Sequence, residues 1–91
     1  MKTLHVVSMN NPGILDALPS GEQDVLLTED AVCMLAGNVP RITELAGQQS
    51  LFALEPDLVA RGISCPEGVT AVDYAGMVEL TETHAPIVCW N

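Results

Sequence analysis

The fold is decided by the stretch Leu51-Phe52-Ala53-Leu54-Glu55-Pro56-Asp57-Leu58-Val59-Ala60-Arg61-Gly62, which predicts a buried strand passing directly into a short helix. Residues 51–54 form a four-residue apolar run, as in a strand covered on both faces. Pro56 suits the first helical turn, because its missing amide would have no intrahelical partner there. Asp57 places negative charge at the positive end of the helix, and Gly62 supplies a left-handed residue that ends it. A strand that feeds a helix in this way is the unit of a doubly wound α/β domain.

Strand-like and helix-like segments alternate along the rest of the chain. Short apolar runs predict further strands at residues 3–8, 24–27, 69–72 and 87–90. Other helical segments are expected at residues 14–18, 31–36, 41–45 and 74–83, with Asp30 capping the second of them. The alternation predicts a three-layer α/β/α fold with a five-stranded, mostly parallel sheet, in a single domain spanning residues 1–91.

The composition is apolar for so short a chain. Hydrophobic residues make up 48% of the 91 residues, and the mean hydropathy is +0.31. A small domain has too little interior to bury that much aliphatic surface. We therefore expect part of it to face a partner; the alternative is an unusually aliphatic core.

The charge balance is strongly acidic. Lys2, Arg41 and Arg61 are the three basic residues, against twelve acidic ones, for a formal net charge of -9. Nucleic-acid binding draws on many Lys and Arg contacts to phosphates, so direct binding of RNA or DNA by this chain is not expected. The acidic surface either meets a basic partner or serves solubility.

The sequence offers no pattern for a membrane span, a secretory signal or a bound metal or cofactor. No apolar run approaches the roughly 20 residues that cross a bilayer, and no CxxC or HExxH spacing occurs. Three cysteines are an odd number without regular spacing, which argues against a disulfide framework and favours the cytoplasm.

Cys33 is the cysteine with the best chemical claim. It follows the expected cap Asp30 in a first helical turn, where the helix dipole favours the thiolate. Glu29 and Asp30 oppose that effect with like charge, and no Lys or Arg is close in sequence. The alternative is a buried thiol that packs as a small hydrophobe. Cys65 is expected to be an inert surface residue and Cys89 a core residue.

Three residues near the end of the chain are candidates for a partner interface. Tyr74 follows Asp73, which either fixes a turn through its side chain or joins the interface. His84 either orients a partner's thiolate or caps the carbonyls at the end of the preceding helix. Trp90 either anchors a partner or closes the protein's own core.

Several segments resemble the TusB/DsrH family of small sulfur-relay subunits, which is related to the DsrE family. Residues 52–62 look like the corresponding segment of the family, and the match spans nearly the whole chain in order. The other matching parts are Leu4–Ser8, Val25–Val32, Asp73–Thr81, His84 and Trp90.

The resemblance implies a DsrE-like fold and a place in a heterohexamer with TusC/DsrF-like and TusD/DsrE-like subunits. Such complexes relay persulfide sulfur. The Tus branch leads to 2-thiolation of the wobble uridine in tRNA, and the Dsr branch serves intracellular sulfur oxidation.

The sequence departs from a sulfur-carrying member at two places. The TusD/DsrE sister carries its nucleophilic cysteine where the third strand meets its helix, but the matching residues here are Leu54 and Glu55. Some DsrH members have a cysteine in the first helix, and residues 14–18 contain none. The chain is therefore expected to have an assembly and pocket-shaping role in the tRNA-thiolation branch. The alternatives are a persulfide carrier using Cys33 in the DsrH branch, and a homo-oligomeric module of unrelated function.

Overall fold

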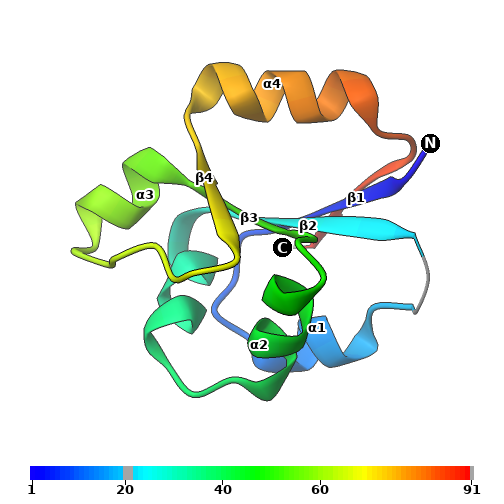
Figure 1. The fold of residues 1–91 in the computed structure, drawn as a ribbon. Helices are drawn as coiled ribbons and strands as arrows, with labels where there is room; N and C mark the ends of the chain where they lie inside the picture. Colours follow the sequence, from blue (N-terminus) through cyan, green and yellow to red (C-terminus); the bar gives the residue numbers. More distant parts are fainter. Residues whose placement is uncertain (20–21, 91) are drawn as a thin grey trace.

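A computed structural model describes residues 1–19 and 22–90 of the protein. Within them, five strands pair in parallel in one sheet, in the order β4-β3-β2-β1-β5 (Figure 1). The strands are β1 (Thr3–Val7), β2 (Gln23–Leu27), β3 (Leu51–Leu54), β4 (Val69–Val72) and β5 (Ile87–Trp90). The predicted sheet is confirmed, and every pairing in it is parallel.

Helices cover both faces of this sheet. They are α1 (Pro12–Ala17), the 3-10 helix η1 (Glu29–Ala36), α2 (Pro40–Gly47), α3 (Glu55–Ala60) and α4 (Tyr74–Thr83). The elements α1, η1 and α2 lie on one face and α4 lies alone on the other, while α3 extends beyond the end of β3 (Figure 1). The predicted three-layer α/β/α architecture is therefore confirmed.

The stretch from β3 into α3 folds as its residues dictate. Pro56 lies in the first turn of α3, and Gly62 has the left-handed φ of 64° expected of a residue that follows a helix end. The predicted bounds of β3, β4, α4 and β5 agree with the structure. The helix α2 is longer than predicted, because Pro40 begins it and it continues to Gly47.

The prediction that Asp30 caps a helix is wrong. The segment is a 3-10 helix whose cap position is Thr28, so Asp30 lies within its first turn. The Asp30 carboxylate instead pairs with Arg61, which α3 and the residues after it bring close. A cation remote in the sequence thus replaces the local backbone amide as its partner.

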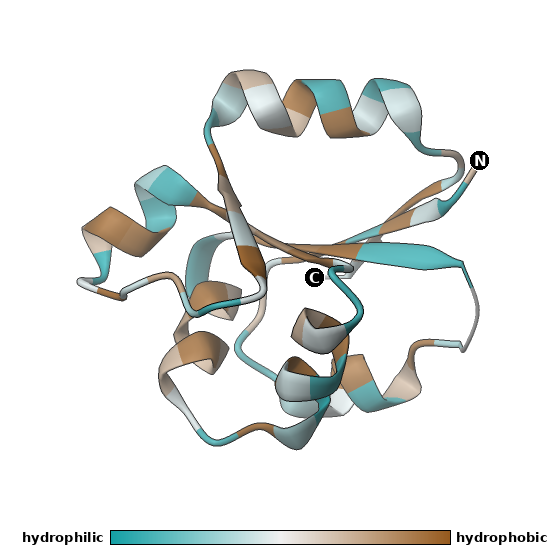
Figure 2. Cartoon of the chain, in the orientation of Figure 1, coloured by the Kyte–Doolittle hydropathy of each residue, from teal (hydrophilic) through white to brown (hydrophobic). Residues whose placement is uncertain are grey.

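The two faces of the sheet are buried to different extents. Toward α1, η1 and α2, the side chains of Val7, Leu27 and Ala53 lie in register on neighbouring strands and are fully buried in the main core. Toward α4, Leu4, Leu26 and Leu54 are buried, but Val6 and Phe52 are only partly buried and α4 itself has no buried residue. The apolar strands lie in the middle layer of the fold (Figure 2). The cover on the α4 side is therefore less complete than on the other side.

Polar contacts hold α4 at both ends. At its start, the Asp73 carboxylate accepts a hydrogen bond of 2.8 Å from the Gly76 amide. Just after its end, His84 Nε2 lies 2.6 Å from a carboxylate oxygen of Asp24, which is buried on β2. Lys2 Nζ lies 3.8 Å from the other oxygen of the same carboxylate. The helix is therefore fastened by its ends rather than by a buried apolar stripe.

The loop before β4 makes a close backbone contact with α2 at Gly68. Gly68 has a φ of 86°, and a Cβ built on it would lie 2.8 Å from the carbonyl oxygen of Ala46. We predict that Gly68→Ala lowers the free energy of unfolding by about 1–3 kcal/mol, because it adds backbone strain to a steric overlap. Urea denaturation measures the change.

Gly47→Ala is the matched control. A Cβ at Gly47 meets no atom within 4 Å, and Gly47 lies inside a helix. The control should be neutral or stabilise the protein by up to about 1 kcal/mol. Equal stability of the two alanine variants would contradict the proposed close contact.

Candidate functional site

The carboxyl ends of the parallel strands meet at one edge of the sheet, which is where sites gather in open α/β folds. A cavity of about 270 Å³ opens there between the sheet and α4. We call it the carboxyl-edge cleft; its lining residues are Val6, Thr28, Glu29, Leu54, Asp57, Tyr74 and Met77. Strands β1 and β3, helices η1, α3 and α4, and Thr28 directly after β2 all contribute to it, so residues far apart in the sequence meet at one place.

Glu29 has a strained backbone at the end of β2. Its φ is 51°, in the left-handed region that non-glycine residues rarely occupy. Its amide donates a hydrogen bond of 2.7 Å to Oδ2 of Asp57, on α3. This contact between η1 and α3 offsets the strain and fixes the mouth of the cleft, and such outliers concentrate at functional sites.

Arg61 links the same two elements from outside the cleft. Its guanidinium Nη2 lies 2.9 Å from Oδ1 of Asp30, and Nη1 lies 3.6 Å from Oδ1 of Asp57. The hydrogen bond to Asp30 raises the pKa of Arg61, partial desolvation opposes the shift, and the charges of Asp30, Asp57 and Cys33 add to it. The result is a permanent cation beside η1.

Cys33 is half-buried on η1, near this cation. It is the fifth residue of a 3-10 helix rather than a member of a first α-helical turn. Asp30 lies three residues before Cys33 and therefore on the same side of this 3-10 helix, so its partner Arg61 is a cation on the Cys33 side that no local sequence pattern could reveal. Pairing of the hydrophobic strands β2 and β3 could have suggested that Arg61 lies near η1. This pairing brings together η1 and α3, the helices that follow the two strands.

Cys65 is a poor candidate nucleophile. Its thiol lies 3.2 Å from the Val69 carbonyl oxygen, to which it donates a hydrogen bond. Partial burial raises the pKa of the Cys65 thiol, and the negative charge of Glu55 raises it further. The thiolate is therefore disfavoured, in agreement with the inert role predicted for this residue.

Cys89 does not belong to the core, contrary to the prediction. It is exposed on the edge strand β5, where its side chain shares a face of the sheet with Val6. The reason is that α4 does not cover this part of the sheet, although the apolar neighbours of Cys89 are typical of a buried strand.

The structure places the candidate interface residues in two different environments. Tyr74 is 59% exposed at the start of α4 and lines the carboxyl-edge cleft. The His84 side chain is 8% exposed, and its Nδ1 lies 2.8 Å from the Leu80 carbonyl oxygen while Nε2 faces Asp24. His84 thus caps the end of α4, one of the two roles predicted for it, whereas Tyr74 is open to contact.

Trp90 packs against the main core and contacts β1. Its indole Nε1 donates a hydrogen bond of 3.0 Å to Nδ1 of His5. The other ring nitrogen of His5 lies 2.8 Å from Oε1 of Gln23. His5 can satisfy both contacts as a neutral ring protonated at Nε2, so this buried row joins β5, β1 and β2.

The described residues form neither a metal centre nor a membrane-spanning helix. Within residues 1–19 and 22–90, no group of three or more His, Cys, Asp or Glu side chains could hold a metal ion. No helix in this part of the chain is long and apolar enough to cross a bilayer. A cavity larger than the carboxyl-edge cleft lies along α2, on the face of the sheet away from α4. Its lining contains neither cysteine nor histidine.

These features define a class of protein: a doubly wound α/β fold with an acidic carboxyl-edge cleft. The cleft is lined by the carboxylates of Glu29 and Asp57 and by no thiol. Such a lining disfavours anionic persulfides and favours positively charged groups.

Comparison with known proteins identifies the family. The family described as DsrH like protein matches residues 14–87. Protein TusB of Serratia proteamaculans (strain 568) is 33% identical over 81 residues, covering 87% of this chain and 85% of its own length. Protein TusB of Yersinia pestis (strain Pestoides F) and of Yersinia pseudotuberculosis serotype O:1b (strain IP 31758) are each 32% identical over 76 residues, covering 80% of both chains. The chain belongs to the TusB/DsrH family, and this membership supports the role of a sulfur-relay subunit that the sequence resemblance implies.

The raised pKa of Cys65 predicts slow alkylation of this thiol in the folded protein. At about pH 8 the folded protein should react with iodoacetamide at Cys65 several-fold more slowly than the urea-unfolded protein, because less thiolate is present. The two rates should converge as the pH rises well above the raised pKa. Peptide mass spectrometry after timed quenching measures both rates.

Glu55→Gln tests whether the negative charge of Glu55 contributes to the raised pKa of Cys65. It removes the smaller, electrostatic contribution, so the folded-state rate should increase modestly and remain below the unfolded rate. Alkylation of folded Cys65 as fast as in the unfolded chain at about pH 8 would show that the thiol is not shielded.

Proposed function

We propose that this protein is an assembly subunit of a sulfurtransferase complex of the TusBCD/DsrEFH type, acting in the cytoplasm in the sulfur relay for 2-thiolation of the tRNA wobble uridine. In this proposal it docks onto TusC/DsrF-like and TusD/DsrE-like subunits in a heterohexamer and shapes the pocket around a sister's cysteine. The observation that carries the proposal is the incomplete cover of the sheet by α4, which has no buried residue.

The proposed docking surface is the α4 face, defined as the exposed apolar side chains on α4 and β5. Tyr74 is 59% exposed, Val78 is 51% exposed and Ile87 is 39% exposed. Tyr74 and Val78 are four residues apart on a helix and therefore lie on the same side of it. Exposed apolar side chains gathered around one layer are typical of a protein-protein contact.

The junction of β3 and α3 supports a role without sulfur chemistry of its own. By resemblance this junction holds the nucleophilic cysteine in the sister subunit, whereas here Glu55 begins α3 and is exposed. Its carboxylate also disfavours the thiolate of the neighbouring Cys65. The local electrostatics at this junction therefore oppose an anionic sulfur nucleophile.

The charge of the chain indicates the partner's character. With a formal net charge of -9, the protein attracts a basic protein surface and repels the phosphates of tRNA. In the proposed complex, tRNA chemistry is thus left to other components, and this subunit contributes contact area.

Charge introduced on the α4 face should break the complex. The variant Tyr74→Glu/Val78→Glu should weaken binding to the co-purified sister subunits by about 100-fold or more, because two apolar anchors are replaced by buried unpaired charges. Isothermal titration calorimetry measures the affinity. Circular dichroism should show an unchanged fold, since both side chains are exposed.

Val59→Glu is the matched control for added charge. Val59 is 74% exposed but lies on α3, away from the α4 face. This variant should bind as the wild type does. Undiminished binding of Tyr74→Glu/Val78→Glu would exclude α4 as the docking element, and a wild-type chain without affinity for either sister, whether monomeric or homo-oligomeric, would exclude the function itself.

A second candidate function is a persulfide carrier using Cys33 in intracellular sulfur oxidation. The specific observation in its favour is the Arg61 guanidinium, which pairs with Asp30 on the side of η1 that also carries Cys33, because a cation attracts a persulfide anion. A persulfide donor should then add about 32 Da, one sulfur atom, at Cys33 by mass spectrometry.

One variant decides this candidate. Cys33→Ser should abolish sulfur transfer by the complex. Full transfer by Cys33→Ser would exclude the carrier role and leave the assembly role intact.

A further inference from the structure

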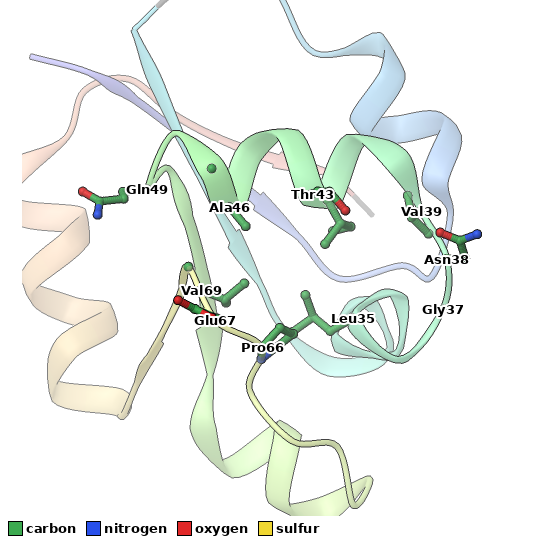
Figure 3. Close-up of a pocket in the computed structure, with 13 residues that line it drawn as sticks. Leu35, Gly37, Asn38, Val39, Thr43, Ala46, Gln49, Pro66, Glu67 and Val69 are labelled. Carbon is green, nitrogen blue, oxygen red and sulfur yellow. The ribbon is translucent and has the colours of Figure 1, made fainter.

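A second cavity lies along α2, on the face of the sheet opposite α4. Its volume is about 510 Å³, within the usual range of small-molecule sites. We call it the α2 pocket; its lining residues are Leu35, Gly37, Asn38, Val39, Ile42, Thr43, Ala46, Gly47, Gln49, Pro66, Glu67, Gly68 and Val69. The segment before β4 forms one wall and α2 forms the other (Figure 3).

Apolar side chains form the inside of this pocket. Leu35, Ala46 and Val69 point into the space between α2 and the segment before β4 (Figure 3). Ile42 and Val69 also belong to the main core, with 8% and 9% of their surfaces exposed, so the pocket reaches the core directly. An apolar body placed here would displace water from these side chains.

The only charged side chain of the lining is a carboxylate. Glu67 is exposed at the pocket, and no ion pair involves it within residues 1–19 and 22–90. The nearest cation on α2 is Arg41, which does not line the pocket and already pairs with Glu44. The other polar lining side chains, Asn38, Thr43 and Gln49, are neutral.

The walls of the pocket are held in place by the backbone. Gly68 approaches α2 so closely that a Cβ on it would lie 2.8 Å from the Ala46 carbonyl oxygen. The segment before β4 is thereby seated against α2 rather than free to collapse into the pocket. A preformed cavity of this kind needs little reorganisation to accept a ligand.

We propose that the α2 pocket binds a small organic cation, a compact apolar body carrying a primary ammonium group that pairs with Glu67. The apolar lining selects the body, and the unpaired carboxylate selects the charge. The net charge of -9 attracts cations to the protein and disfavours carboxylates and phosphates of the same size. This inference is independent of the proposed assembly role, because α2, which lines the pocket, and α4 lie on opposite sides of the sheet (Figure 1).

The test compares three probes of matched size, n-hexylammonium, n-hexanol and hexanoate, in NMR titrations of the full chain. The amides of Gly37, Gly47 and Gly68 report from three parts of the lining. For a ligand of this size we expect saturable shifts with a dissociation constant on the order of 1 mM for n-hexylammonium. Hexanol should bind more weakly, and hexanoate should bind least.

Two variants separate the charge from the cavity. Glu67→Gln should weaken binding of n-hexylammonium by about two- to fivefold and leave hexanol unchanged, because one solvent-exposed ion pair is lost. Gly47→Leu should abolish binding of both, because Gly47 lines the pocket and the open space around its Cβ leaves room for a leucine that would compete with the ligand. A leucine inside a helix also costs no stability relative to glycine, so this variant should remain folded.

Three outcomes would overturn the proposal. The first is the absence of saturable shifts at the three glycines up to about 10 mM n-hexylammonium, far above the expected dissociation constant. The second is hexanoate binding as tightly as n-hexylammonium. The third is unchanged binding by folded Gly47→Leu. The variant Tyr74→Glu/Val78→Glu should bind the probe like the wild type, so failure of this site and failure of the assembly role remain distinguishable.

Discussion

The structure depends on one constraint: a parallel sheet exposes apolar side chains on both faces, and both require cover. One face of the sheet is fully covered, because α1, η1 and α2 pack together over residues such as Val7 and Leu27. The other face has a single helix, and that helix has no buried residue. The incomplete cover leaves a surplus of apolar surface at α4 and β5, consistent with an apolar composition in so short a chain. We interpret this surplus as the part of the core that a partner completes.

Polar contacts, rather than apolar packing, hold α4 in place over the sheet. The buried carboxylate of Asp24 receives His84 from the end of the helix and Lys2 from the start of β1. A buried carboxylate left without these partners would be costly, so the helix end is held over the sheet even though its middle contributes little burial. The cap at Asp73 fixes the other end. The helix can therefore present Tyr74 and Val78 outward in a defined position.

Much of the fold was readable from the sequence, because its local signals agree with its tertiary structure. The bounds of β3, β4, α4 and β5 follow from apolar runs bounded by turn residues, and Gly62 marks a left-handed residue as expected. The failures occur where a long-range contact replaced a local one. Asp30 was expected to cap its own helix, but Arg61 takes its carboxylate, and the exposure of Cys89 on an apolar strand reflects a missing layer that no local pattern encodes. The strained Glu29 and its bond to Asp57 could not be foreseen either, since they require β2 and β3 to be paired first.

The place of β5 in the sheet has a consequence for how the protein is made. β5 pairs with β1, and Trp90 contacts His5 across nearly the whole chain. During translation β1 emerges from the ribosome first and must wait for β5, while β2, β3 and β4 can already assemble on its other side. Until then β1 is an open edge with unpaired backbone groups, which invites pairing with other nascent chains. A chaperone that shields this edge would shorten that vulnerable interval.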